Sequence, residues 1–184
     1  MYAILDIEST GGKYNEEGIT EIAIYKFDGH EIVDQFISLI NPERKIQSFV
    51  VGLTGINNEM LHYAPKFYEV AKRIVEITEG CILVAHNAKF DYRMLRLEFD
   101  RLGYDFERKS LCTVKLSKKL LPGFESYSLG KLVKDLGIPI TDRHRASGDA
   151  MATVKLFKML LEKDVDKEII SSNLKLNSIS SIDK

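Results

Sequence analysis

The sequence contains few cysteines and no long apolar run, and both shortages narrow the class of protein. Only Cys81 and Cys112 are present among 184 residues, and both lie in apolar surroundings without the spacing of a zinc site. We therefore expect a reduced, cytoplasmic protein. No apolar run approaches the length of a membrane span, and no basic segment precedes the first apolar stretch, so we expect no membrane partner and no secretory signal.

Several motifs of common enzyme classes are also missing. The sequence has no Gly-x-x-x-x-Gly-Lys-Ser/Thr loop for nucleoside triphosphates and no Gly-x-Ser-x-Gly turn of serine hydrolases. Gly11 and Gly12 follow a predicted strand but open no predicted helix, which argues against a dinucleotide site.

The composition that remains is ordinary for a globular protein. Hydrophobic residues make up 45% and charged residues 29% of the chain, and 184 residues suffice for one domain with a sizeable core. The net charge is only −1, but residues 1–34 are rich in acids and residues 108–145 in lysine and arginine. This asymmetry fits an acidic metal site and a basic surface for a phosphate backbone, although such runs are usually solvated helix faces.

The order of predicted elements indicates an α/β fold. Strands are predicted at 3–8, 19–27, 30–40, 81–86 and near Leu111, and helices at 58–62, 65–78, 88–103, 126–137 and 146–161. An antiparallel meander followed by helix–strand–helix units predicts a mixed sheet with helices on both faces. We expect one domain at 1–163, followed by a tail or linker at 164–184 that is rich in Ser, Asn and Lys.

Two carboxylates at the start of the chain raise the first functional question. Asp6 and Glu8 alternate along an apolar strand, so both side chains point to the same side and lie next to each other. Two like charges in a partly buried place need a compensating cation. The alternative is that Glu8 lies beyond the strand in solvent and that Asp6 pairs with a lysine.

Two predicted helices carry an aspartate near their start, on the apolar face. Asp91 precedes Leu95 and Phe99 by four and eight residues, and Asp149 precedes Thr153 and Phe157 by the same spacings. Each aspartate alone could simply stabilise a helix start. Together with the acids of the first strand, they predict four carboxylates beside one sheet, an arrangement that suits Mg²⁺ or Mn²⁺.

Three motifs occur in order along the chain: Asp6-x-Glu8, His86-Asn87-x-x-x-Asp91 and His144-x-x-x-x-Asp149. This set resembles the three motifs of the DEDDh (DnaQ-like) 3′–5′ exonucleases, a family that includes the epsilon proofreading subunit of bacterial DNA polymerase III. The resemblance covers about residues 1–162. The histidine five residues before the last aspartate matches the DEDDh branch, because Arg145 stands where the other branch has tyrosine.

The resemblance implies a ribonuclease H-like fold with a five-stranded mixed sheet in the order 3-2-1-4-5. It also implies that Asp6, Glu8, Asp91 and Asp149 hold two divalent metal ions, Mg²⁺ or Mn²⁺, and that His144 is the general base. The substrate-binding residues carried over are Ser9, Thr10, Gly11, Leu53, Thr54 and Asn87. Ser9 and Cys112 depart from the family, which usually has threonine and aspartate at these positions.

The expected function is hydrolysis of terminal phosphodiester bonds of DNA from the 3′ end, releasing 5′-mononucleotides in proofreading or repair. Expected partners are single-stranded or frayed 3′ ends, with DNA favoured, and a DNA polymerase or a fused nuclease module. Two alternatives stay open on the sequence. One is a 3′–5′ exoribonuclease acting on RNA or short oligoribonucleotides. The other is an inactive nucleic-acid-binding or polymerase-docking module, which the filled catalytic positions disfavour.

Overall fold

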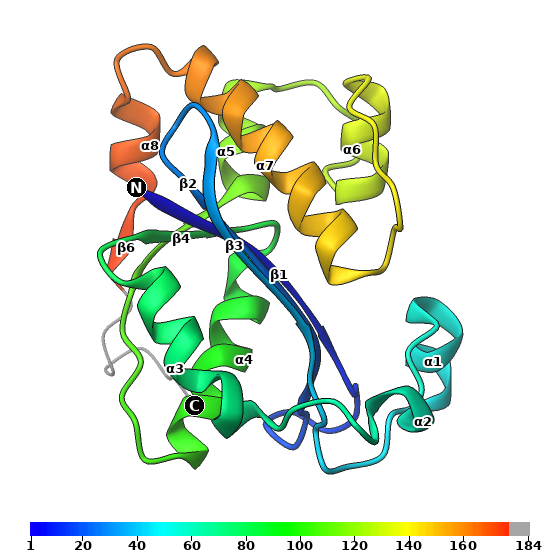
Figure 1. The fold of residues 1–184 in the computed structure, drawn as a ribbon. Coiled ribbons are helices and arrows are strands. Elements are labelled where there is room, and N and C mark those ends of the chain that lie inside the picture. The colour runs from blue at the N-terminus through cyan, green and yellow to red at the C-terminus, as the bar shows by residue number, and fades with distance from the viewer. Residues whose placement is uncertain (177–184) are drawn as a thin grey trace.

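The computed structural model describes residues 1–176 of the chain. In this part, six strands form one mixed sheet in the order β3-β2-β1-β4-β5-β6 (Figure 1). The strands are β1 (Tyr2–Ser9), β2 (Ile19–Phe27), β3 (Ile32–Leu39), β4 (Ile82–Ala85), β5 (Lys109–Cys112) and β6 (Lys175–Leu176). The predicted meander and the predicted order of the first five strands are therefore confirmed.

Helices cover both faces of the sheet, as predicted. They are α1 (Ser48–Thr54), α2 (Asn58–Leu61), α3 (Phe67–Thr78), α4 (Ala88–Arg101), α5 (Thr113–Leu120), α6 (Leu129–Asp135), α7 (Ala146–Lys163) and α8 (Glu168–Asn173). Figure 1 shows α3 and α4 on one side of the sheet and α5, α6 and α7 on the other. No helix among the described residues has the length and apolar character needed to cross a bilayer.

The region predicted as a tail begins with ordered structure. Asp164 accepts hydrogen bonds from the backbone N–H groups of Ile169 and Ile170, at 3.3 and 2.7 Å, and so caps the start of α8. Ile170 is buried in the core on the α7 side of the sheet, and β6 adds a short antiparallel strand beside β5. The rest of the predicted tail, 177–184, lies outside the described residues, and the division after residue 163 stays a prediction.

The alternation of side chains along β1 divides the core into two layers. Leu5 and Ile7 pack with α3 and α4, whereas Ile4 packs with α7 on the opposite face. Because Asp6 and Glu8 alternate with Leu5 and Ile7, their side chains point to the α7 side of the sheet.

In the described part of the chain, one edge of β1 is left unpaired beside these acids. This strand pairs with antiparallel β2 over its whole length, from Tyr2 to Ser9, but with parallel β4 only from Tyr2 to Ile4. Among residues 1–176, the carboxyl-terminal half of β1 therefore has no neighbouring strand on one side. Ligand sites of α/β proteins commonly form at such points, where neighbouring connections leave in opposite directions.

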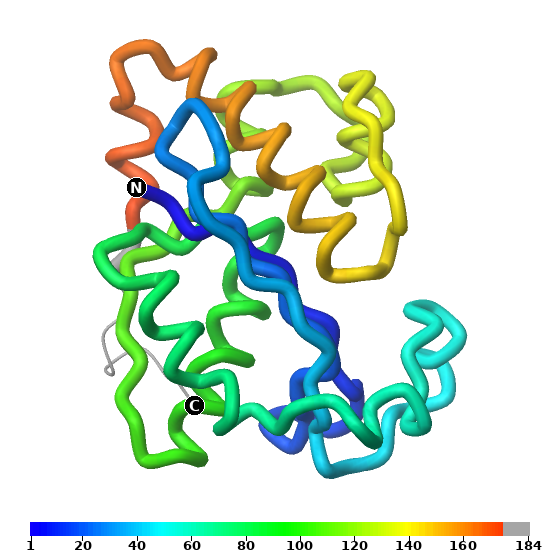
Figure 2. Tube along the Cα trace, viewed as in Figure 1, coloured from blue at the N-terminus to red at the C-terminus, as the bar shows by residue number. Residues whose placement is uncertain are grey.

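The segment of α1 and α2 lies beside the end of β1, away from the helical layers (Figure 2). The backbone N–H of Gln47 donates a hydrogen bond to the carbonyl oxygen of Thr10 at 2.9 Å, which ties this segment to the loop after β1. The segment has a small core of its own, formed by Ile46, Val50, Ile56 and Leu61. Helix α1 was not predicted, because its short apolar run carries no clear helical period.

Candidate active site

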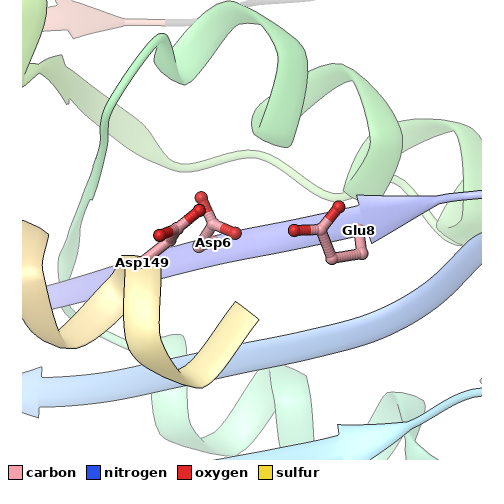
Figure 3. A group of neighbouring side chains, drawn as sticks. All are labelled: Asp6, Glu8 and Asp149. Carbon is pink, nitrogen blue, oxygen red and sulfur yellow. The ribbon is translucent and has the colours of Figure 1, made fainter. Parts of the chain in front are cut away.

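Three carboxylates from two elements meet on the α7 side of the sheet. Asp6 and Glu8 come from β1, and Asp149 comes from the first turn of α7 (Figure 3). One oxygen from each lies within 4.8 Å of the other two, a spacing that could hold a metal ion. The alternative that Glu8 lies beyond the strand in solvent is wrong, because β1 continues to Ser9 and pairs Glu8 with Glu21 of β2.

Burial and mutual repulsion make this group unfavourable without a cation. Burial, followed by the charges of Asp91, Glu8 and Asp149, holds the pKa of Asp6 well above its usual range. Burial and the charge of Asp149 raise the pKa of Glu8 to about 8. No lysine forms an ion pair with Asp6 in the part of the chain that the structure describes. A bound divalent cation would relieve both the burial cost and the repulsion.

Asp149 supplies a direct test of fit to a metal ion. Its Oδ2 atom accepts a hydrogen bond from the backbone N–H of His144 at 3.3 Å. Its Oδ1 atom is buried and makes no hydrogen bond with any described residue. An unpaired buried carboxylate oxygen is costly, and it is also the kind of ligand that Mg²⁺ and Mn²⁺ prefer. The donor set therefore fits a hard divalent cation.

Asp91 lies beside the cluster, although its oxygens are outside the group of three. Its side chain is only 3% exposed, and its Oδ1 atom accepts a hydrogen bond from the backbone N–H of Ile7 at 3.1 Å. This bond replaces the strand partner that β1 lacks after Ile4. Burial raises the pKa of Asp91 to about 8, and among its neighbours Asp91 contributes most to the raised pKa of Asp6.

His144 lies in the loop between α6 and α7, immediately before the helix that carries Asp149. Its backbone is left-handed, with φ of 63°, and its side chain is half-buried. The loop passes close to α7, because a Cβ at Gly148 would lie 2.0 Å from the carbonyl oxygen of Thr141 and 2.5 Å from that of Asp142. Glycine at this position therefore lets the histidine loop approach the start of α7.

The side chains of the loop after β1 form hydrogen bonds within the loop itself. Thr10 is 1% exposed, and its hydroxyl donates to the carbonyl oxygen of Gly11 and accepts from the N–H of Gly18. The hydroxyl of Ser9 accepts a hydrogen bond from the N–H of Gly11 at 3.2 Å. Gly11 has φ of 64°, and a Cβ there would lie 3.2 Å from the Phe49 ring. The predicted substrate-binding residues after β1 thus form a tight loop against α1.

The remaining predicted substrate residues differ in what they expose. Leu53 is 52% exposed on α1, and Asn87 is exposed at the start of α4, where its side chain makes no capping bond. Thr54 is buried, and its hydroxyl donates to the carbonyl oxygen of Val50 and accepts from the N–H of Ile56. Leu53 and Asn87 are therefore accessible at the surface, whereas Thr54 stabilises the end of α1.

His86 has a structural role. One ring nitrogen, Nδ1, lies 2.9 Å from the hydroxyl of Thr113, and the other, Nε2, lies 2.8 Å from the carbonyl oxygen of Tyr127. Burial lowers the pKa of this imidazole. Both ring nitrogens are occupied by hydrogen bonds between β4, α5 and the segment before α6.

Two features next to the site were not predicted from the sequence. Glu21 on β2 is 3% exposed and binds Arg145 at the start of α7. Its signal was a glutamate inside an apolar strand, since fully buried acids are rare unless paired. Phe49 on α1 is 69% exposed beside Gly11. No signal in the sequence separated this ring from the apolar residues around it.

The fold and the carboxylates together define a class of protein. The chain is a ribonuclease H-like domain that carries an acidic cluster at the open end of its central strand. Comparison with known proteins gives the family. The exonuclease family matches residues 3–157, so the chain belongs to that family of hydrolases. The resemblance to 3′–5′ exonucleases inferred from the motifs is confirmed.

Curated relatives are much longer than this chain. A DNA polymerase III PolC-type protein of Caldanaerobacter subterraneus subsp. tengcongensis is 35% identical over 178 residues, which are 97% of this chain and 13% of the relative. A 3′-5′ exonuclease DinG of Staphylococcus epidermidis is 34% identical over an alignment of 183 residues that covers 95% of this chain and 20% of the relative. The chain thus spans a fifth or less of these two relatives.

Solved structures agree on the fold. Exonuclease X, solved in complex with 5′ overhanging duplex DNA, is 28% identical with a TM-score of 0.72, covering 90% of this chain and 93% of that one. Exonuclease I gives a TM-score of 0.81 at 18% identity, covering 93% of this chain and 42% of that one. The second likeness shows the fold alone.

Proposed function

We propose that this domain is a metal-dependent 3′–5′ exonuclease that removes 5′-mononucleotides from the 3′ ends of DNA. The observation that supports it most is the cluster of Asp6, Glu8 and Asp149, in which a buried Asp149 oxygen has no hydrogen-bond partner within residues 1–176. This cluster occurs in a chain of the exonuclease family.

The proposed metal ligands are the carboxylates of Asp6, Glu8, Asp91 and Asp149, which would hold two ions of Mg²⁺ or Mn²⁺. Such ions, when bound, stabilise the charge that develops on the attacking and leaving oxygens of a phosphodiester. Asp6 is central to the group, since its pKa is raised by the charges of the other three. The hydrogen bond from Ile7 holds Asp91 against the strand that carries Asp6.

His144 is the proposed general base. A neutral imidazole accepts a proton from the water that attacks the terminal phosphate, and the bond between phosphorus and the 3′ oxygen breaks. The main-chain bond from His144 to Asp149 fixes the backbone beside the cluster and leaves the ring free to turn toward a substrate. A base in a loop takes its working position when substrate binds.

The proposed substrate contacts surround the loop after β1. The backbone of Ser9, Thr10 and Gly11 borders the terminal nucleotide, since Gly11 adds no side chain there. Leu53 and Phe49 offer exposed apolar surface for stacking against bases, and Asn87 offers an amide for hydrogen bonds.

DNA is favoured over RNA by the named relatives. The two curated relatives are a DNA polymerase III PolC-type protein and an exonuclease DinG, and Exonuclease X was solved with DNA. We therefore propose a role in proofreading or repair in the cytoplasm. Residues 1–163 would form the exonuclease domain, working within or beside a polymerase or a longer nuclease protein.

The test is a gel assay with matched 5′-labelled single-stranded DNA and RNA, in Mg²⁺ or Mn²⁺, beside EDTA and a His144→Ala protein. A ladder that shortens from the 3′ end of DNA, and that EDTA and the variant abolish, supports the proposal. Equal or faster cleavage of RNA favours the exoribonuclease. Absence of cleavage on both strands in the folded protein overturns the proposal.

A further inference from the structure

We propose that Glu21 and Arg145 form a positioning pair that sets the place of α7, and with it Asp149 and His144, relative to the acids of β1. The inference rests on the proposed function, because it concerns the geometry of the same site. Neither residue belongs to the ligand set or carries out a proton transfer. Their role is to hold two halves of the active site at a fixed spacing.

Arg145 and Glu21 form a bidentate ion pair. Arg145 donates from Nε to Oε2 of Glu21 at 3.0 Å and from Nη2 to Oε1 at 2.7 Å. Parallel bonds between a guanidinium and a carboxylate fix direction as well as distance. The side chain of Glu21 is 3% exposed and that of Arg145 is 35% exposed, so the carboxylate is shielded from salt and water while the guanidinium is partly exposed.

Glu21 also caps the helix that carries Asp149. Its Oε2 atom accepts a third hydrogen bond, from the backbone N–H of Ala146 at 2.9 Å. Ala146 is the first residue of α7, and the preceding residue, Arg145, provides no side-chain cap of its own. A buried carboxylate from β2 therefore accepts a hydrogen bond from one of the free N–H groups at the start of α7. Its negative charge also interacts favourably with the positive end of the helix dipole.

The same glutamate lies directly opposite a proposed metal ligand. Glu21 of β2 pairs in register with Glu8 of β1, so the two side chains point to the same face of the sheet. The backbone N–H of Asp149 donates to the carbonyl oxygen of Arg145 at 3.1 Å, in the first turn of α7. A short chain of bonds thus runs from the strand bearing Glu8, through Glu21 and Arg145, to Asp149.

The placement of His144 depends on the same anchor. His144 immediately precedes Arg145, and its backbone N–H bonds to Asp149. If the start of α7 moved away from β2, the histidine loop and the Asp149 carboxylate would both move relative to Asp6 and Glu8. A displacement of about 1 Å at a catalytic group can lower turnover by roughly 100-fold.

The experiment compares Glu21→Gln and Arg145→Lys with the wild-type protein. Glutamine keeps the size of the side chain but loses the charge, and lysine keeps the charge but loses the two-pronged fork. Turnover with single-stranded DNA is measured separately from KM, and Mn²⁺ affinity is measured by calorimetry without DNA. Asp34→Asn is the matched control, because Asp34 and Arg73 form a 2.6 Å ion pair between β3 and α3, remote from the site.

Both variants are expected to lower kcat and Mn²⁺ affinity by roughly 10–100-fold, the usual cost of losing a group that orients a metal ligand. KM for DNA should change little, and the control should keep wild-type values. In the variant carrying both substitutions the losses should be less than additive, because each substitution removes the same interaction.

Unchanged kcat and Mn²⁺ affinity in a folded Glu21→Gln protein would overturn the inference. Wild-type kcat and Mn²⁺ affinity in the Arg145→Lys protein would also overturn it, since a positive charge without the guanidinium geometry would then suffice. If burial of Glu21 prevents folding of its variant, Arg145→Lys decides, because that side chain is partly exposed. A wild-type protein that binds Mn²⁺ but cleaves nothing would refute the proposed function, while the Mn²⁺ comparison still tests the pair.

Discussion

The backbone N–H of His144 donates a hydrogen bond to Oδ2 of Asp149 at 3.3 Å. The residue of the proposed base therefore contacts a proposed metal ligand through its main chain and not through its imidazole. A substitution of the imidazole leaves this bond in place. The two functions of the segment, proton transfer and support of the ligand, can therefore be separated by mutation.

Replacement of His144 by asparagine should lower kcat by about 10²–10⁴-fold, because general-base catalysis is lost. Mn²⁺ affinity should be unchanged. Asparagine is the better replacement than alanine, since it tolerates the left-handed backbone with φ of 63°. Single-turnover cleavage and calorimetry are the measurements, with His30→Asn in the exposed β2–β3 turn as the control. Near-normal cleavage by the variant would refute the base assignment.

Replacement of Asp6 by asparagine should abolish cleavage and weaken Mn²⁺ binding, yet it should stabilise the metal-free protein at pH 8. Burial and four neighbouring carboxylates raise the pKa of Asp6, so its ionised form is unfavourable in the fold. Thermal unfolding in EDTA and in Mn²⁺ tests this. The variant should melt above wild type in EDTA and gain little from the metal. A lower melting temperature in EDTA would contradict the electrostatic account.

The stability of the metal-free protein should fall as pH rises from about 4.5 to about 8. In the folded chain the pKa values of Glu8 and Asp91 are raised to about 8, from 4.5 and 3.8. Within this window the unfolded chain has released protons that the folded chain retains, so deprotonation favours unfolding. Urea unfolding in EDTA at several pH values measures the slope. Glu8→Gln should flatten it, and a stability that rises with pH would contradict the prediction.

Replacement of Gly148 by alanine should lower stability by about 1–3 kcal/mol, because the new methyl group overlaps backbone atoms. The Cβ would lie 2.0 Å from the carbonyl oxygen of Thr141, in the loop that carries His144. Turnover should fall as that loop is pushed from α7. Gly52→Ala in α1 is the control for stability, since a Cβ there would have no described atom within 4 Å apart from its chain neighbours and its own helix backbone. Wild-type stability and turnover in the Gly148 variant would contradict the close approach.

Replacement of Phe49 by alanine should raise KM for single-stranded DNA by about 10-fold, the loss expected when one base no longer stacks on a ring. The Phe49 side chain is 69% exposed, so thermal stability should hardly change. Tyr63→Ala is the control, because this ring is 92% exposed but lies after α2. Steady-state assays of both variants and of wild type are the measurement. A KM of the Phe49 variant equal to that of wild type would show that Phe49 does not contact the substrate.

The sequence alone predicted the α/β class from local signals, and the order and spacing of its three motifs identified the family. The strand order and the proposed ligand set followed from that resemblance. Alternation in β1 put Asp6 and Glu8 on one face, and helical spacing put Asp91 and Asp149 toward the core. The meander followed from turn residues between apolar runs.

Only the tertiary structure determined which residues far apart in sequence contact each other. Glu8 is shielded rather than solvated because β1 pairs with β2 to its end. Glu21 meets Arg145 across 124 positions, and the hydroxyl of Thr54 is used inside α1 rather than by a ligand. Periodicity within one element carries no information about such partners, because they depend on how separate elements pack together.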